Sequence, residues 1–195
     1  DGKLGTEEQQ RIAKRLEELT GVAADVWVRS GLKLPSSAFA KQLLAASGRE
    51  VGMYDSRYTL PAGGIGDPVA DDPAMGRYVP GFVAAFHDLL GLLQVRMPYP
   101  YASIAFGWAF NWNFARAGVP DHYTYAHDLG VSLRRTPRLR ILVCSGYYDL
   151  VTSPAGAEAA ILAAQLPLDR VTFRNYESGH MLYLGGTSAQ FAHDL

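Results

Sequence analysis

Residues 139–146 read Leu-Arg-Ile-Leu-Val-Cys-Ser-Gly, a run of mostly apolar side chains that closes on glycine. This composition is typical of a strand buried on both faces of a sheet. A helix over 123–135 is expected before it, and an alanine-rich helix over 155–165 after it. A second run of β-forming residues covers 171–176, and a last helix is expected over 187–195. This alternation of helices and strands predicts an α/β fold with a parallel sheet.

The residues before this unit have a different character. Helical periodicity is expected in three stretches, the last of them over 81–93, and the segment 61–80 is rich in Gly, Pro and Asp and predicts a loop. The chain therefore divides into a mostly helical insertion, residues 1–118, and the C-terminal part of an α/β core, residues 119–195.

Composition excludes several classes of protein. The chain has 195 residues, a net charge of −1 and a single cysteine, Cys144. The charge balance argues against a nucleic-acid surface, and one cysteine cannot form an internal disulfide. No run approaches eighteen apolar residues, so no membrane span is expected.

Two polar residues follow the predicted strands at their carboxyl ends, where α/β sheets gather their chemistry. Asp149 follows the first strand and His180 follows the second. Taken singly, such an Asp is usually a turn former and such a His a hydrogen-bonded loop residue. Together, and in this order, they favour catalysis, because a carboxylate beside an imidazole orients the ring and stabilises its protonated form.

The sequence around these two residues resembles that of a known family. Residues 141–152 resemble the acid-bearing segment of the serine carboxypeptidases, and 176–183 resemble their Gly-His-Met segment. The likeness is specific over 138–184. It is looser upstream, where 54–58 and the aromatic block near Trp108 are similar to the helical cap of the bacterial branch. The resemblance implies the C-terminal part of an α/β-hydrolase sheet, preceded by the cap, in an enzyme that hydrolyses C-terminal peptide bonds.

The resemblance also implies roles for individual residues. Asp149 would be the acid of the catalytic triad and His180 its base, while Met181 would border the pocket for the terminal side chain of a peptide substrate. Trp108 and Trp112 are four positions apart, which favours packing in the core. The alternative is that they line the apolar substrate pocket from the cap.

No metal or cofactor is implied. His122 and His127 are five positions apart, about 140° around a helix, so they do not share a face. The glycines of 63–66 lack the spacing of a dinucleotide-binding loop.

One departure from the family is serious, because the chain contains no Gly-x-Ser-x-Gly motif. Ser145 lies within the predicted strand and Ser178 is too close to His180 in sequence to be its nucleophile. We therefore expect the serine and the oxyanion hole in an upstream segment or chain of the same protein, and this chain alone to be inactive. Two alternatives stay open: an esterase or acyltransferase on the same scaffold, and a binding protein that has lost its serine. Family likeness suggests a periplasmic or secreted protein.

Overall fold

The computed structural model describes residues 4–99, 101, 103, 118 and 124–195. In this part of the chain the fold is mixed α/β with two small sheets. The C-terminal unit comprises α5 (Tyr125–Arg135), β3 (Ile141–Gly146), α6 (Pro154–Ala163), the short helix η2 (Leu168–Arg170), β4 (Val171–Tyr176), η3 (Gly185–Thr187) and α7 (Ser188–Asp194).

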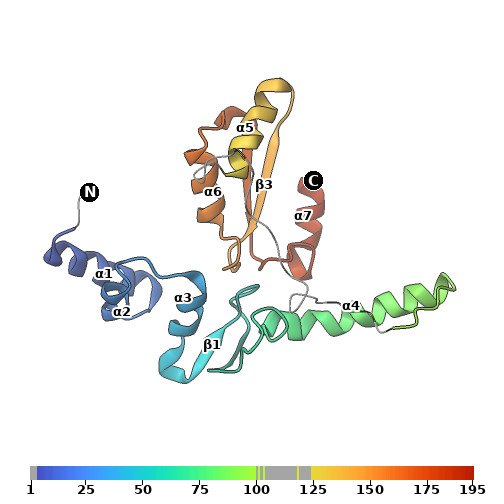
Figure 1. Cartoon of the computed structure of the whole chain (residues 1–195), viewed down its shortest axis with the longest axis horizontal. Coiled ribbons are helices and arrows are strands. Elements are labelled where there is room, and N and C mark those ends of the chain that lie inside the picture. The colour runs from blue at the N-terminus through green and yellow to red at the C-terminus, as the bar shows by residue number, and fades with distance from the viewer. Residues whose placement is uncertain (1–3, 100, 102, 104–117, 119–123) are drawn as a thin grey trace.

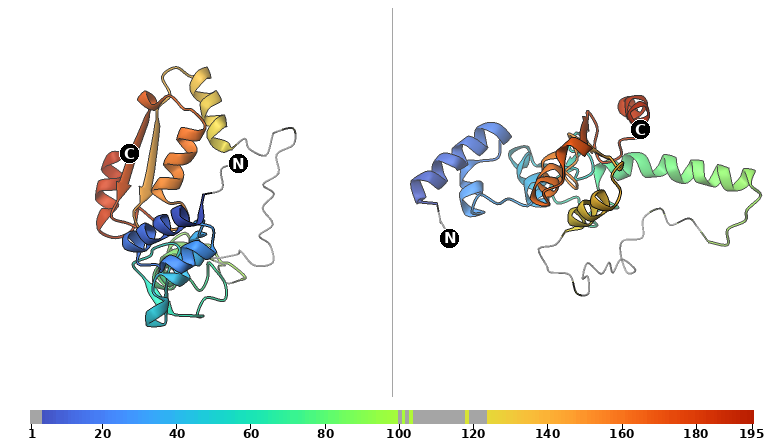
Figure 2. Two further views of the ribbon diagram at one scale, coloured as in Figure 1. Left: turned by 90° about the vertical axis from the view of Figure 1, so that its left-hand side faces the viewer. Right: turned by 90° about the horizontal axis from the view of Figure 1, so that it is seen from above.

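Strands β3 and β4 are parallel, in a register that pairs Ile141 with Val171 and Gly146 with Tyr176. Helices α5 and α6 lie on one side of the two strands and α7 on the other (Figures 1 and 2). The core on the α5–α6 side centres on the buried side chains of Leu133, Ile161 and Leu166. Parallel strands joined by a helix are what the sequence predicts, and that prediction is confirmed.

Local signals explain the boundaries of this unit. The Ser153 hydroxyl accepts a hydrogen bond from the Gly156 N–H and Pro154 occupies the first turn, so α6 begins where a capped helix should. Strand β4 has its predicted bounds, and β3 begins two residues after the predicted start at Leu139.

The N-terminal part is built mainly from helices. It comprises α1 (Thr6–Thr20), α2 (Ala24–Arg29), α3 (Ser36–Gln42), η1 (Ala45–Ser47), β1 (Arg49–Val51), β2 (Thr59–Pro61) and α4 (Pro73–Leu92). Helices α1 and α2 enclose a small core of Ala13, Val22 and Trp27, and β1 and β2 form an antiparallel pair.

Helix α4 begins eight residues before the predicted start at Gly81, so the prediction of a loop through 61–80 is wrong from Pro73 onward. Asp72 caps the helix by accepting from the Ala74 N–H at 2.9 Å, and Pro73 suits a first turn that needs no N–H donor. Pro80 lies inside the helix without ending it.

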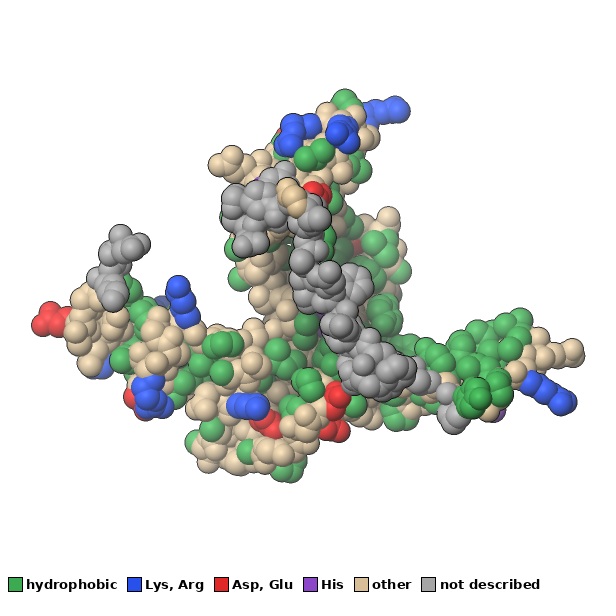
Figure 3. Space-filling model, in the orientation of Figure 1, with side chains coloured by type: hydrophobic (Ala, Val, Ile, Leu, Met, Phe, Trp, Pro, Cys, Tyr) green, Lys and Arg blue, Asp and Glu red, His purple; other side chains and the backbone are tan. Residues whose placement is uncertain are grey.

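The distal half of α4 projects away from the rest of the fold (Figure 1), and apolar side chains gather at that end (Figure 3). Leu92 at its end is 82% exposed. With 20 residues, α4 is the longest helix of the described part of the chain, and no helix there has the length and apolarity needed to cross a membrane.

Candidate active site

Three loops that are distant in sequence meet at the carboxyl end of the parallel sheet. They cover residues 53–58, 146–152 and 176–181, and we call their meeting point the loop junction. Backbone hydrogen bonds hold them together: Leu150 N–H to Met53 O at 2.9 Å, Ser56 N–H to Tyr148 O at 2.9 Å, Tyr148 N–H to Ser178 O at 3.0 Å, and His180 N–H to Tyr54 O at 2.7 Å. The first loop belongs to the part of the chain that sequence patterning assigned to the helical insertion, yet it is bonded directly to both loops of the α/β unit.

Two glycines allow the loops to approach this closely. A Cβ atom at Gly146 would lie 2.2 Å from the Gly179 carbonyl oxygen. A Cβ atom at Gly179 would lie 2.4 Å from the Tyr54 carbonyl oxygen and 2.6 Å from the Asp55 Cβ. These distances are all far shorter than side chains tolerate, so any larger residue would force the loops apart.

The junction brings Asp149 and His180 together, as the sequence analysis expected of them. The Asp149 Oδ2 atom lies 2.9 Å from His180 Nδ1. Its Oδ1 atom accepts from the N–H groups of Val151 and Thr152, at 2.8 and 3.0 Å, and Oδ2 also accepts from the Thr152 hydroxyl at 2.6 Å. Asp149 is 3% exposed, so its carboxylate is buried but fully hydrogen-bonded.

These contacts shift the pKa values of the two groups in opposite directions. Burial of Asp149 opposes its charge, but hydrogen bonds from His180, Thr152 and the backbone outweigh burial and lower the pKa of the carboxyl group. The hydrogen bond to Asp149 raises the pKa of His180 above its usual value, against a smaller opposing effect of burial. Such a pair stabilises the imidazolium that forms when the ring takes up a proton.

The other ring nitrogen, Nε2, is available for chemistry. No residue of the described part of the chain makes a hydrogen bond with it, and the side chain is 38% exposed. The Tyr54 ring meets the imidazole edge to face at a centroid distance of 5.3 Å. The ring is therefore held on its Nδ1 side and open on its Nε2 side.

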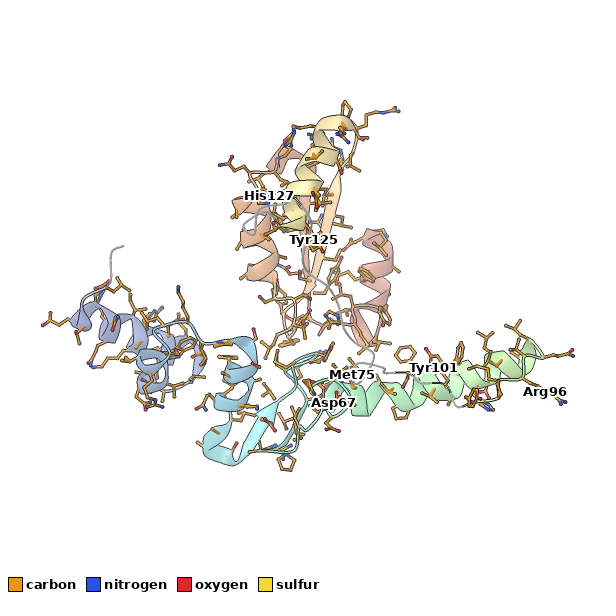
Figure 4. All side chains as sticks on the ribbon, viewed as in Figure 1. Asp67, Met75, Arg96, Tyr101, Tyr125 and His127 are labelled. Carbon is orange, nitrogen blue, oxygen red and sulfur yellow. The ribbon has the colours of Figure 1, made fainter. Side chains whose placement is uncertain are left out.

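His180 borders a cavity of about 500 Å³ with predominantly apolar walls. The walls come from α4, the loop after β4 and neighbouring segments: Tyr54, Val69, Met75, Val79, Phe82, Phe86, Tyr101, Ser103, Met181 and Tyr183. Figure 4 labels two of them, Met75 at the start of α4 and Tyr101 alongside it. In these described walls, His180 is the one residue able to carry a positive charge.

The predicted site residues therefore have different outcomes. Asp149 and His180 are in contact, and Met181 lies on the cavity wall beside His180. Trp108 and Trp112 lie outside the described residues. Ser145 and Ser178 are buried, at 6% and 4% exposure.

Several residues that shape the site were not singled out from the sequence. Asp72 is fully buried, and besides capping α4 it accepts from the Met53 N–H at 2.6 Å, which ties the start of α4 to the junction. Met75 and Phe82 bring α4 into the cavity wall. The Asp72-Pro73 pair is a readable helix start, whereas the contact between Tyr54 and His180 spans 126 positions and leaves no local signal.

Comparisons with known proteins return no match: no family model, no curated protein and no solved structure is similar to this chain. Within the described residues no three ligating side chains cluster in a way that could hold a metal ion.

Proposed function

We propose that this chain supplies the acid and the base of a serine-type hydrolase resembling the serine carboxypeptidases. The observation that supports this most strongly is the 2.9 Å contact between Asp149 Oδ2 and His180 Nδ1, with Nε2 open beside an apolar cavity. A buried carboxylate on one ring nitrogen and a free lone pair on the other are the requirements of a general base acting on a hydroxyl.

In the proposed reaction a serine hydroxyl attacks the carbonyl carbon of a C-terminal peptide bond while His180 Nε2 takes the hydroxyl proton. The same nitrogen then gives that proton to the departing amine, and the C–N bond breaks to leave an acyl-enzyme. Water hydrolyses the ester by the same two proton transfers. Asp149 stays ionised throughout and stabilises the charged ring.

The nucleophile is proposed to come from a segment upstream of residue 1. Ser145 and Ser178 are buried, and neither has the strand-to-helix turn that exposes a nucleophilic serine. Ser103 borders the cavity with His180, but it too lacks a Gly-x-Ser-x-Gly setting, and no hydrogen bond among the described residues joins it to the ring.

The cavity walls indicate the class of group that the enzyme binds. Met75, Phe82 and Met181 offer apolar surface, and the described walls carry no carboxylate or guanidinium that could pair with a charged side chain. A peptide with a bulky apolar residue next to the scissile bond fits this environment, because burial of that residue supplies binding energy without leaving a charge unpaired.

The decisive test is fluorophosphonate labelling of the natively produced protein, with mass spectrometry to locate the label. We expect the label on a serine outside residues 1–195, on a polypeptide that remains associated or continuous with this chain. The His180→Ala variant should lose most of the labelling, whereas His193→Ala should keep it, because His193 is exposed on α7 and lies outside the junction loops.

Two other outcomes would contradict the proposal in different ways. A label on Ser103 would place the nucleophile inside this chain and overturn the proposed upstream serine. No label on folded native protein would exclude a reactive serine and favour a binding protein that keeps the Asp–His pair.

A further inference from the structure

Thr152 touches both members of the Asp–His pair. Its backbone N–H donates to Asp149 Oδ1 at 3.0 Å, and its hydroxyl donates to Asp149 Oδ2 at 2.6 Å. The same hydroxyl oxygen lies 3.2 Å from His180 Nδ1. Thr152 therefore contacts both carboxylate oxygens, one through its backbone N–H and the other through its hydroxyl, and the hydroxyl also lies beside the ring nitrogen that the carboxylate orients.

The single proton of a hydroxyl restricts how these contacts can be arranged. Because the proton of Thr152 points to Asp149 Oδ2, its oxygen can only accept from His180 Nδ1. Nδ1 then carries a hydrogen that faces two acceptors, Oδ2 at 2.9 Å and the Thr152 oxygen at 3.2 Å. The neutral ring compatible with this arrangement has its hydrogen on Nδ1 and a bare lone pair on Nε2, which is the form a general base needs.

We propose that Thr152 is a positioning residue, whose hydroxyl holds the Asp149 carboxylate and the His180 ring in the base-competent arrangement. Its effect on turnover rests on the proposed function, but its effect on the pair itself does not. Thr152 is absent from the described walls of the cavity, so it acts through Asp149 and His180 rather than on a substrate.

The backbone N–H groups of this turn, rather than the Thr152 hydroxyl, serve the purely structural role of holding the carboxylate in place. The N–H groups of Val151 and Thr152 already hold Asp149 Oδ1, and these bonds persist in any variant that keeps the turn. Thr152 is also exposed, so replacing its hydroxyl leaves no buried polar group of its own unpaired. Removal of the hydroxyl should therefore leave the fold intact, and lower stability at neutral pH only by the amount that corresponds to the rise in the pKa of Asp149.

The test compares Thr152→Val, which keeps the branched shape, with Thr152→Ser, which keeps the hydroxyl. Carbon-13 NMR of the Asp149 carboxyl group in the intact protein measures its pKa. The titratable side chains facing this carboxylate are His180 and, more distantly, Tyr54. Loss of the hydroxyl donor in the Val variant should raise the pKa of Asp149 by roughly one unit, and the Ser variant should titrate like the native protein.

A native-like titration of Asp149 in the Val variant would overturn the proposal, and so would a raised pKa in the Ser variant. Kinetics give a second readout if the protein is a hydrolase. The Val variant should lose kcat while its KM stays near the native value, since no substrate contact is removed. A rise in KM alone would place Thr152 in substrate binding. If native protein shows no turnover, the proposed function fails, and the titration still decides the role of Thr152.

Discussion

The loop junction and helix α4 meet at one cavity, but they are built in opposite ways. In the junction, polar groups are buried and paired: Asp149 and Asp55 are each 3% exposed and both accept several hydrogen bonds. Helix α4 presents apolar side chains that stay partly open, with Phe82 at 43% and Leu89 at 47% exposure. Directional hydrogen bonds hold the junction together, whereas the apolar side chains of α4 make contacts that have no fixed geometry.

This difference corresponds to two tasks that the proposed hydrolase site must combine. Proton transfer requires atoms held within a few tenths of an ångström, which hydrogen bonds and close backbone contact provide. Recognition of an apolar group requires contact area rather than directional hydrogen bonds, and apolar side chains with several rotamers provide that area. Changes in the junction should therefore abolish chemistry or folding, and changes on α4 should alter preference.

The largest effect is expected from the Asp–His pair itself. In the complete protein, His180→Ala removes the proposed base and should lower the kcat of the proposed hydrolysis by about 10⁴-fold or more. Asp149→Asn should lower it by roughly 10⁴-fold because the ring loses its orienting carboxylate. Steady-state kinetics of each variant, with an unblocked and with a C-terminally blocked peptide, measure the two losses of kcat.

His193→Ala is the matched control and should leave kcat unchanged, since this exposed histidine lies on α7 outside the junction loops. Circular dichroism must show that all the variants are folded. A folded His180→Ala variant with native turnover would rule out the base assigned here.

A smaller but still large effect is expected from the close contacts of the junction. Gly179→Ala places a Cβ atom 2.4 Å from the Tyr54 carbonyl oxygen, so the backbone must shift, at a cost of about 3 kcal/mol in the free energy of unfolding. Gly186→Ala adds a Cβ atom with nothing within 4 Å and should change stability by less than about 0.5 kcal/mol.

Urea unfolding of both variants measures the difference. Equal stability of the two variants would mean that the loops are not packed as closely as described. A destabilised Gly179→Ala variant that keeps native kcat would mean that the junction can relax without moving His180.

The sequence predicted the elements of the C-terminal unit well because their signals are local. Apolar runs mark β3 and β4, and Ser153-Pro154 marks the start of α6. The proximity of Asp149 and His180 followed from the same reasoning, since parallel strands end at one edge of a sheet. The arrangement of the hydrogen-bonding partners around Asp149 and His180 did not follow from that reasoning.

What could not be predicted depends on contacts between distant segments. No local pattern shows that the Tyr54 carbonyl accepts from the His180 N–H, or that Asp72 ties α4 to Met53. Helix α4 was placed too late because Pro80 and the glycines nearby favour a loop, and the favourable start at Asp72-Pro73 outweighs them. Helix propensity predicted the wrong start for α4, because capping and tertiary contacts outweigh propensity at these residues.

The smallest effect is expected on α4, and it tests whether the helix selects the substrate. The Phe82 ring borders the cavity and packs edge to face on Tyr183 at 6.4 Å between centroids. Phe82→Ala should lower kcat/KM about tenfold for a peptide with a bulky apolar group and much less for one with alanine there, because mainly the large group loses contact area. Leu92→Ala, at the exposed end of the same helix, removes apolar surface outside the described cavity walls and should change neither value. Equal losses on both peptides would show that α4 supports the fold of the site without choosing its substrate, and the apolar preference would then have to come from Met181 and the junction side of the cavity.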